Sequence, residues 1–318
     1  MMKTLLIIGG TGFFGKSILD AFSRGLLEPW QIAKVIVMSR NTQVLKTEAP
    51  QLLNANVELL SADITTTDFL PNADYVIHAA ASTDVRNYIT QPETEKKNIQ
   101  AGTYHYCELA KKFHLKSKIV YTSSGAVYGT QPSNIPQINE YEMPSGLVHM
   151  DIAKQSYAVA KHDAELAIKQ LGAEGLNVSI ARCFAFVGCW LPRNQHFAIG
   201  NFIEDAINKR PIVVKTTHKV YRSYMYADDL VEWLMTMADS ASSDCPIYNV
   251  GSDHAVILGD LATTIASRSQ TQADVPSISE SKIDRYVPST EKAKKVLGLT
   301  LKYDLTASID ATIQKINQ

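Results

Sequence analysis

From residue 3 to about residue 180, short runs of apolar and often β-branched residues alternate with longer amphipathic stretches. Runs that are apolar at successive positions are typical of strands covered on both faces, and their alternation with helices predicts βαβ units around a parallel sheet. The predicted strands are residues 4–8, 34–38, 57–60, 75–78, 119–122 and 178–181. The predicted helices are residues 12–27, 93–113 and 154–171.

Beyond residue 181 the alternation weakens. Helices are predicted at 197–209, 227–237 and 258–267, strands at 212–214 and 247–250, and a surface connection at 267–281. We therefore predict an α/β fold with a Rossmann-like doubly wound parallel sheet in residues 1–181. Residues 182–318 are expected to form a smaller mixed α/β lobe for the substrate, with some chain crossing back to the first domain.

Three glycines follow the first predicted strand at a spacing of three. Gly9 would permit a sharp turn, Gly12 would let backbone N–H groups approach a pyrophosphate, and Gly15 would let the next helix pack closely. The N-terminus of that helix would face the phosphates. Turns collect glycine for conformational reasons alone, but a triplet between a strand and an amphipathic helix favours a dinucleotide site.

The end of the second strand indicates which dinucleotide binds. An acidic residue there bonds the ribose 2′-hydroxyl of NAD. This chain has Ser39-Arg40 instead, and a guanidinium pairs with the 2′-phosphate of NADP. NADP is therefore favoured over NAD, the alternative being that Arg40 points into solvent or stacks on the adenine.

Tyr157 and Lys161 lie four residues apart in a predicted helix, which places both on one face. A nearby ammonium would lower the pKa of the phenol from about 10, so that Tyr157 could exchange a proton with a substrate hydroxyl or carbonyl. Ser124 follows the fifth strand, at the sheet edge where ligands of open α/β folds bind, and could share that proton. Taken singly, an amphipathic helix and a serine-rich turn would also explain these residues.

Several motifs occur in a fixed order: Gly9-x-x-Gly12-x-x-Gly15, Asp63-Ile64, His78-Ala79-Ala80-Ala81, Thr122-Ser123-Ser124 with Val127-Tyr128-Gly129, and Tyr157-x-x-x-Lys161. As a set they resemble the extended short-chain dehydrogenases/reductases, and within them the NAD(P)-dependent nucleotide-sugar epimerase/dehydratase group. Residues 222–230 and 248–252 resemble second-lobe motifs of that group. The resemblance spans about residues 3–265.

The resemblance implies roles for individual residues. The catalytic residues would be Ser124, Tyr157 and Lys161. The substrate, a nucleoside-diphosphate sugar, would contact Thr83, Ser124, Arg193 and Arg222, with Arg222 on the diphosphate. NADP or NAD would contact Gly9, Thr11, Gly12, Phe13, Phe14, Gly15, Ser39, Arg40, Asp63, Ile64, Ala79, Ala80, Ala81, Tyr157, Lys161 and Phe184. The alternatives are an ion pair of Arg222 with Asp228 or Asp229, and a solvated loop for Arg193 and His196.

Departures from the family narrow the expected reaction. Ile99 stands where the family commonly has an asparagine, and Cys183, after strand six, is interpreted as a packed thiol. Dehydratases of the group carry a Thr-Asp-Glu motif where this chain has Ser124-Gly125-Ala126. Neither glycine nor alanine can protonate a leaving hydroxyl, so 4,6-dehydration is disfavoured.

The resemblance therefore implies an enzyme acting at the sugar C4, as a 4-keto-sugar reductase or a 4-epimerase, in surface polysaccharide or deoxysugar biosynthesis. A 4,6-dehydratase and a non-catalytic dinucleotide sensor are the alternatives.

Related enzymes also dimerise by pairing helices 93–113 and 154–171 across a two-fold axis. Leu109, Phe113, Leu166 and Leu171 could make that homodimer contact or could bury against the sheet.

Composition excludes several other classes of protein. The 31 Lys and Arg residues balance 32 Asp and Glu residues, so no global field recruits nucleic acid or a membrane. The first apolar run ends at Ile8, far short of a signal peptide or of the roughly 20 residues of a membrane span, and a cytoplasmic protein is expected. The four cysteines lack C-x-x-C spacing and the eight histidines do not cluster, which predicts reduced thiols and no metal site.

Overall fold

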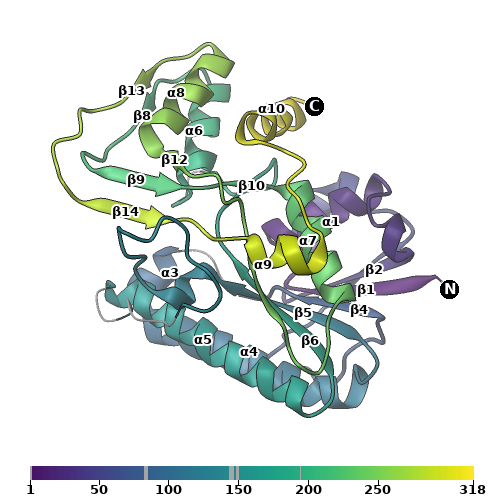
Figure 1. The fold of residues 1–318 in the computed structure, drawn as a ribbon. Coiled ribbons are helices and arrows are strands. Elements are labelled where there is room, and N and C mark those ends of the chain that lie inside the picture. Colours follow the sequence, from purple (N-terminus) through teal and green to yellow (C-terminus); the bar gives the residue numbers. More distant parts are fainter. Residues whose placement is uncertain (1, 82–84, 143–146, 148–149, 194) are drawn as a thin grey trace. The chain divides into compact units, whose positions relative to one another are not determined.

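The computed structural model describes residues 2–81, 85–142, 147, 150–193 and 195–318. Its central sheet has seven strands in the order β11-β6-β5-β4-β1-β2-β3 (Figure 1). In that order they are Ile247–Val250, Asn177–Cys183, Lys118–Ser124, Tyr75–His78, Lys3–Ile8, Ile32–Ser39 and Val57–Ser61. Every pairing from β6 to β3 is parallel, which confirms the predicted doubly wound α/β fold.

The helices that connect these strands are α1 (Phe13–Ser23), α4 (Pro92–Phe113) and α5 (Ile152–Ala173). Helix α1 ends four residues before the predicted position, because Gly25 takes a φ of 77° in the turn that follows. Helix α5 begins where Asp151 caps it, its Oδ1 accepting a hydrogen bond from the Lys154 amide at 2.9 Å. Figure 1 shows α4 and α5 packed side by side.

Apolar side chains of the central strands and of α4 and α5 form the core beneath the site. Its members include Leu6, Ile8, Ile36, Val76, Leu109, Ile119, Ala160, Ala164, Ile168, Leu171 and Ile180. Leu109 and Leu171 are thus buried within the chain, as the alternative to a dimer contact expected, and Phe113 packs against the same core. Leu166 is 51% exposed, so it stays available to a partner.

The strand order reverses between β1 and β4. The chain adds strands in one direction from β1 to β3 and in the other from β4 to β6. Open α/β sheets bind ligands at such a switch point, beyond the carboxyl ends of the strands. The residues that follow β1 and β4 therefore lie where folds of this kind bind their ligands.

The edge strand β11 differs from the sequence prediction. Residues 247–250 were expected in the smaller lobe, whereas the structure places them beside β6 in the central sheet. The Ile180 amide donates to the oxygen of Pro246 at 2.9 Å and so joins β6 to the entry of β11. A segment of four residues carries no mark of which sheet it joins, which is why the pattern could not assign it.

The chain divides into two compact units. Unit 1 comprises Met1–Val127, Asp151–Cys183 and Val231–Tyr248, and unit 2 comprises Tyr128–Met150, Phe184–Leu230 and Asn249–Gln318. Unit 2 contains small sheets that pair β7 with β10, β8 with β13, and β9 with both β12 and β14. Their strands are Phe186–Val187, Met225–Tyr226, Ile212–Val213, Ala273–Asp274, Val256–Ile257, Lys219–Arg222 and Ile283–Tyr286.

The remaining helices are α2 (Gln43–Glu48), α3 (Val85–Thr90), α6 (Ala198–Ile207), α7 (Ala227–Asp239), α8 (Leu258–Ser269), α9 (Glu291–Leu297) and α10 (Leu305–Ile316). Most of the strands in unit 2 have two residues, too few to show a period. The sequence pattern therefore predicted only β8, at 212–214, and missed the others. In the part of the chain that the structure describes, no helix is both long and apolar enough to cross a bilayer.

Candidate active site

The turn after β1 lies against the end of β4. Gly9 has a φ of 86°, and a Cβ built on it would lie 2.6 Å from Cα of Ala80 and 2.7 Å from the oxygen of Ala79. Both the left-handed backbone and the close approach therefore require glycine at this position. The glycine turn and the Ala79-Ala80 segment, which sequence reasoning assigned to one cofactor, lie together at the switch point.

The other two glycines of the triplet differ in their surroundings. A Cβ on Gly15 would lie 2.0 Å from the oxygen of Gly10, so this glycine allows α1 to pack onto the turn. A Cβ on Gly12 would meet only the oxygen of Gly9, at 3.8 Å. Packing does not require glycine at position 12, and the positive end of α1 lies beside it, as a phosphate-binding turn needs.

Polar residues at the ends of β2 and β3 gather beside this turn. The hydroxyls of Thr11 and Ser39 are hydrogen-bonded at 3.0 Å. The Thr65 amide donates to Asp63 at 2.9 Å and lowers the pKa of that carboxyl, and the charge of Arg40 acts in the same direction. Arg40 is exposed. Ile64 differs from these residues because its side chain is buried in the core.

Ser124, Tyr157 and Lys161 are brought together at the carboxyl end of β5. Ser124 is the last residue of β5, its Oγ accepts a hydrogen bond from the Ala126 amide at 3.1 Å, and it is hydrogen-bonded to Tyr157. Lys161 is buried and donates to the main-chain oxygen of Thr122 at 2.9 Å. One helix face thus presents a phenol and an ammonium to the strand that carries the serine, as the four-residue spacing predicted.

Burial controls the acidity of these groups. It raises the pKa of Tyr157 to about 12, against the hydrogen bond from Ser124, which lowers it. Burial also lowers the pKa of Lys161 to about 8. The prediction that the ammonium would lower the pKa of the phenol was therefore wrong, because loss of hydration disfavours the phenolate more strongly.

Two further buried groups lie close to Lys161. The thiol of Cys183 faces the site from β6, in register with Ser124, and burial raises its pKa to about 12. His78, the last residue of β4, packs against the rings of Tyr106 and Tyr121 with centroid distances of 4.8 and 5.4 Å. Burial, together with the charge of Lys161, lowers the pKa of His78 to about 3. Both side chains are therefore neutral near pH 7.

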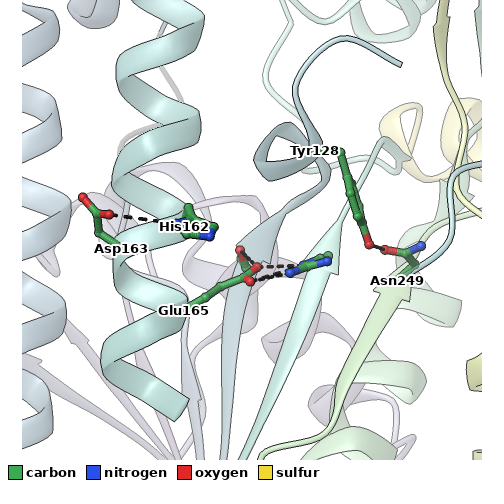
Figure 2. A network of polar contacts seen from close by, with 7 residues as sticks. Tyr128, His162, Asp163, Glu165 and Asn249 are labelled. Carbon is green, nitrogen blue, oxygen red and sulfur yellow. Dashed lines mark hydrogen bonds and ion pairs between the residues drawn. The ribbon is translucent and has the colours of Figure 1, made fainter. Parts of the chain in front are cut away.

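Sequence reasoning missed a buried ion pair behind these residues. The Glu165 carboxylate pairs with Arg182 at 2.7 Å and accepts a hydrogen bond from the Ser123 hydroxyl at 2.6 Å. Figure 2 shows Glu165 reaching from α5 toward the strands, whereas Asp163 of the same helix points elsewhere. The spacing could have singled out Glu165, which continues the four-residue series of Tyr157 and Lys161, but nothing in the sequence marks Arg182 as its partner.

In unit 2 the predicted substrate residues are engaged in ion pairs. Arg222 of β9 pairs with Asp284 of β14 at 2.9 Å, so Asp284 takes the place of the expected partners Asp228 and Asp229. Arg193 pairs with Glu204 of α6 at 2.7 Å. Both guanidinium groups remain partly exposed. Thr83, the other predicted substrate contact, lies outside the described residues.

Asn249 binds several segments of unit 2 together. It is fully buried, and its Oδ1 accepts from the Tyr128 hydroxyl at 2.7 Å (Figure 2). Its Nδ2 donates to the main-chain oxygen of Ile138 at 2.9 Å. Phe184, expected to contact the cofactor, packs against the ring of Tyr286 at 4.7 Å. The hydrogen bond to Asn249 fixes Tyr128, which ends the short 3-10 helix that starts after Ser124.

Comparison with known proteins agrees with this geometry. The profile of the NAD dependent epimerase/dehydratase family matches residues 5–251. The chain belongs to this family. The predicted membership of the NAD-dependent epimerase/dehydratase family of enzymes is thereby confirmed.

Sequence relatives include UDP-glucuronic acid decarboxylase 1 of Danio rerio, 26% identical over 315 residues that cover 98% of this chain and 72% of the relative. UDP-glucuronic acid decarboxylase 6 of Arabidopsis thaliana is 26% identical over 95% of this chain and 85% of its own length. Among solved structures, UDP-glucose 4-epimerase of Thermotoga maritima has a TM-score of 0.80 at 20% identity, covering 99% of this chain and 98% of that one. DesIV, a dTDP-glucose 4,6-dehydratase of Streptomyces venezuelae with NAD bound, has a TM-score of 0.79 at 18% identity, covering 98% and 96%.

Proposed function

We propose that this chain acts at C4 of the sugar in a nucleoside-diphosphate sugar, as a 4-keto-sugar reductase or a 4-epimerase. The observation that carries the proposal is the grouping of Ser124, Tyr157 and Lys161 at the end of β5. Tyr157 can pass a proton to or from an oxygen on C4, and Ser124 can hydrogen-bond the same oxygen. A bound nicotinamide supplies the hydride chemistry.

The residues around the glycine turn fit a dinucleotide. The open space at Gly12 and the N-terminus of α1 suit a pyrophosphate, and Asp63 suits a polar contact to the adenosine. We infer NADP as the preferred form, because Ser39 and the exposed Arg40 stand where an NAD-specific chain has an acid. In unit 2, the guanidinium of Arg222 supports a contact to the substrate diphosphate.

The resting protonation state of Tyr157 is the one that reduction of a ketone uses. With a pKa of about 12, Tyr157 holds its proton near pH 7 and can donate it to a C4 ketone as the hydride arrives. The reverse step needs the phenolate, which burial disfavours and which the Ser124 hydrogen bond favours. The site is therefore prepared to protonate the oxygen of a C4 ketone.

A decarboxylase of a sugar acid is a second candidate, because UDP-glucuronic acid decarboxylases align over 98% of the chain. Oxidation at C4 of a hexuronic acid gives a β-keto acid, which can lose CO₂ without a further acid group. By contrast, 4,6-dehydration has to protonate a leaving hydroxyl. Ala126 cannot do this, and Glu165 is already paired with Arg182.

Product analysis tests this proposal. The protein is incubated with NADPH or NADH and with UDP-glucose, UDP-glucuronic acid, dTDP-glucose and a dTDP-4-keto sugar, and products are identified by proton NMR. Stereochemical change at C4, or reduction of the ketone, is the expected result. Loss of CO₂ from UDP-glucuronic acid would establish the second candidate instead, and release of water from C6 would contradict the proposal.

A further inference from the structure

The buried Glu165 has no role in the proton and hydride chemistry proposed above. It lies one turn beyond Lys161 on α5 and is 1% exposed. Oε1 accepts hydrogen bonds from Ser123 Oγ at 2.6 Å and from Arg182 Nε at 2.9 Å, and Oε2 accepts from Arg182 Nη2 at 2.7 Å. In Figure 2, dashed lines lead from Glu165 on α5 to side chains on the strands. The carboxylate thus joins α5 to the ends of both β5 and β6.

Both strand residues held by Glu165 are next to the site. Ser123 directly precedes Ser124, and Arg182 directly precedes Cys183, which is the register partner of Ser124. A shift of the carboxylate would therefore move the serine hydroxyl relative to the phenol and the ammonium on the helix. Displacements of about 1 Å at a reacting centre can cost about a hundredfold in rate.

Stability alone does not account for this network. Burying two charges carries a desolvation cost, and apolar residues of similar volume often stabilise a core as well or better. Removing one partner, however, leaves an uncompensated buried charge. What an apolar pair could not provide is the directional contact that fixes helix and strands in one register.

We propose that Glu165 is a positioning residue, which holds Ser124, Tyr157 and Lys161 in their reacting geometry by tying α5 to the carboxyl ends of β5 and β6. Its catalytic consequence rests on the proposed function. Its structural consequence, the position of the Lys161 ammonium, does not rest on that function, because the titration of Lys161 can be measured without a substrate.

Glu165 also affects the charge of Lys161. The groups that act on this ammonium are Glu165 on α5, His78 on β4, Tyr121 on β5 and Cys183 on β6, and Tyr157 lies one turn before it on α5. His78, Tyr121, Tyr157 and Cys183 are neutral near pH 7, since burial lowers the pKa of His78 and raises that of the other three. Cys183 first and the Glu165 carboxylate second raise the pKa of Lys161 against burial, and that carboxylate is paired with Arg182.

The first experiment follows the Lys161 titration by NMR in protein with isotope-labelled lysine, the resonance being identified by its loss in Lys161→Met. Glu165→Gln is expected to lower the titration midpoint by about one pH unit, because Arg182 keeps its charge while the carboxylate is lost. Asp163→Asn is the matched control, since Asp163 lies on the same helix and bonds Gln100 of α4 at 2.6 Å. A midpoint that Glu165→Gln leaves in place would overturn the proposal.

The second experiment separates positioning from stability. Glu165→Gln is expected to lower kcat tenfold to a hundredfold and to leave the KM for the dinucleotide within about twofold. The double variant Glu165→Leu/Arg182→Met removes both charges, so its Tm is expected to return to the wild-type value while kcat stays low. Recovery of Tm and kcat together would show that the network only packs the core.

Ser123→Ala covers the case in which the charge variants do not fold. It removes one neutral hydrogen bond and is expected to lower kcat severalfold with a Tm within a few degrees of wild type. An unchanged kcat in this variant would count against the proposal. A wild-type protein without activity on nucleotide sugars would remove the proposed function, and the Lys161 titration would then still decide the role of Glu165.

Discussion

Lys161 Nζ donates a hydrogen bond to the main-chain oxygen of Thr122 at 2.9 Å, which anchors helix α5 to the strand that ends in Ser124. The contact is buried, so it is strong and directional. Because it uses the main chain, no substitution on β5 can remove the acceptor. The main chain of β5 therefore helps to fix the position of the Lys161 ammonium.

Tyr157→Phe is expected to lower turnover by about 10² to 10⁴, because it removes the proton donor and leaves the ring in place. The affinity for the dinucleotide, measured by nicotinamide fluorescence, should change little. Tyr141→Phe, at a tyrosine that is 80% exposed, is the control and should keep wild-type turnover. Equal turnover in Tyr157→Phe and wild type would remove this residue from the mechanism.

Substitution of the glycines should separate folding from cofactor binding. Gly9→Ala places a Cβ 2.6 Å from Cα of Ala80 at a φ of 86°, and is expected to cost about 3 kcal/mol or more in unfolding free energy. Gly12→Ala meets only the oxygen of Gly9 at 3.8 Å, so it should fold normally and lose dinucleotide affinity. Urea unfolding and fluorescence titration measure the two effects. Normal dinucleotide affinity in Gly12→Ala would mean that the phosphates bind elsewhere.

Arg40→Ala is expected to weaken NADPH binding by roughly tenfold to a hundredfold, since it removes a charged partner of the 2′-phosphate. NADH binding should stay within about twofold. Lys34→Ala, at an exposed lysine of β2 that pairs with Glu58, is the matched control for loss of a positive charge. If both dinucleotides lose affinity equally in Arg40→Ala, the guanidinium contacts the adenine or the common phosphates.

His78 should make the fold sensitive to acid. Its pKa is lowered to about 3 by burial, from 6.5 in the unfolded chain. Between these values the unfolded chain binds a proton that the folded chain does not, so stability falls as the pH falls from about 6.5 toward 3, by at most about 1.4 kcal/mol per pH unit. His78→Phe should flatten this slope in urea unfolding, and His254→Gln, at an exposed histidine, should not. A slope that survives His78→Phe would assign the effect to other groups.

The sequence predicted much of unit 1 because its signals are local. The β1 run followed by Gly9, Gly12 and Gly15 is a continuous pattern, and the spacing of Tyr157 and Lys161 follows from helix geometry. Local sequence patterns could not predict that burial would raise the pKa of Tyr157, because burial depends on the packing of segments distant in sequence.

Other features depend on pairings between distant residues. Arg222 meets Asp284, 62 positions away, because β9 and β14 are neighbours in a sheet whose short strands leave no period in the sequence. The ion pair of Glu165 with Arg182 also joins a helix to a strand, and no spacing rule links the two positions. Such partners become visible only once the fold is known.

The central claim is that Tyr157, Ser124 and Lys161 serve hydride transfer at a sugar C4 next to a bound nicotinamide. Its most direct test is stopped-flow absorbance at 340 nm after mixing the NADPH-loaded protein with a nucleoside-diphosphate 4-keto sugar. We predict a single-turnover decrease in wild type that is at least a hundredfold slower in Tyr157→Phe. Demonstrated dinucleotide binding with no absorbance change, for this sugar and for its 4-hydroxy counterpart with the NADP⁺-loaded or NAD⁺-loaded protein, would contradict the account.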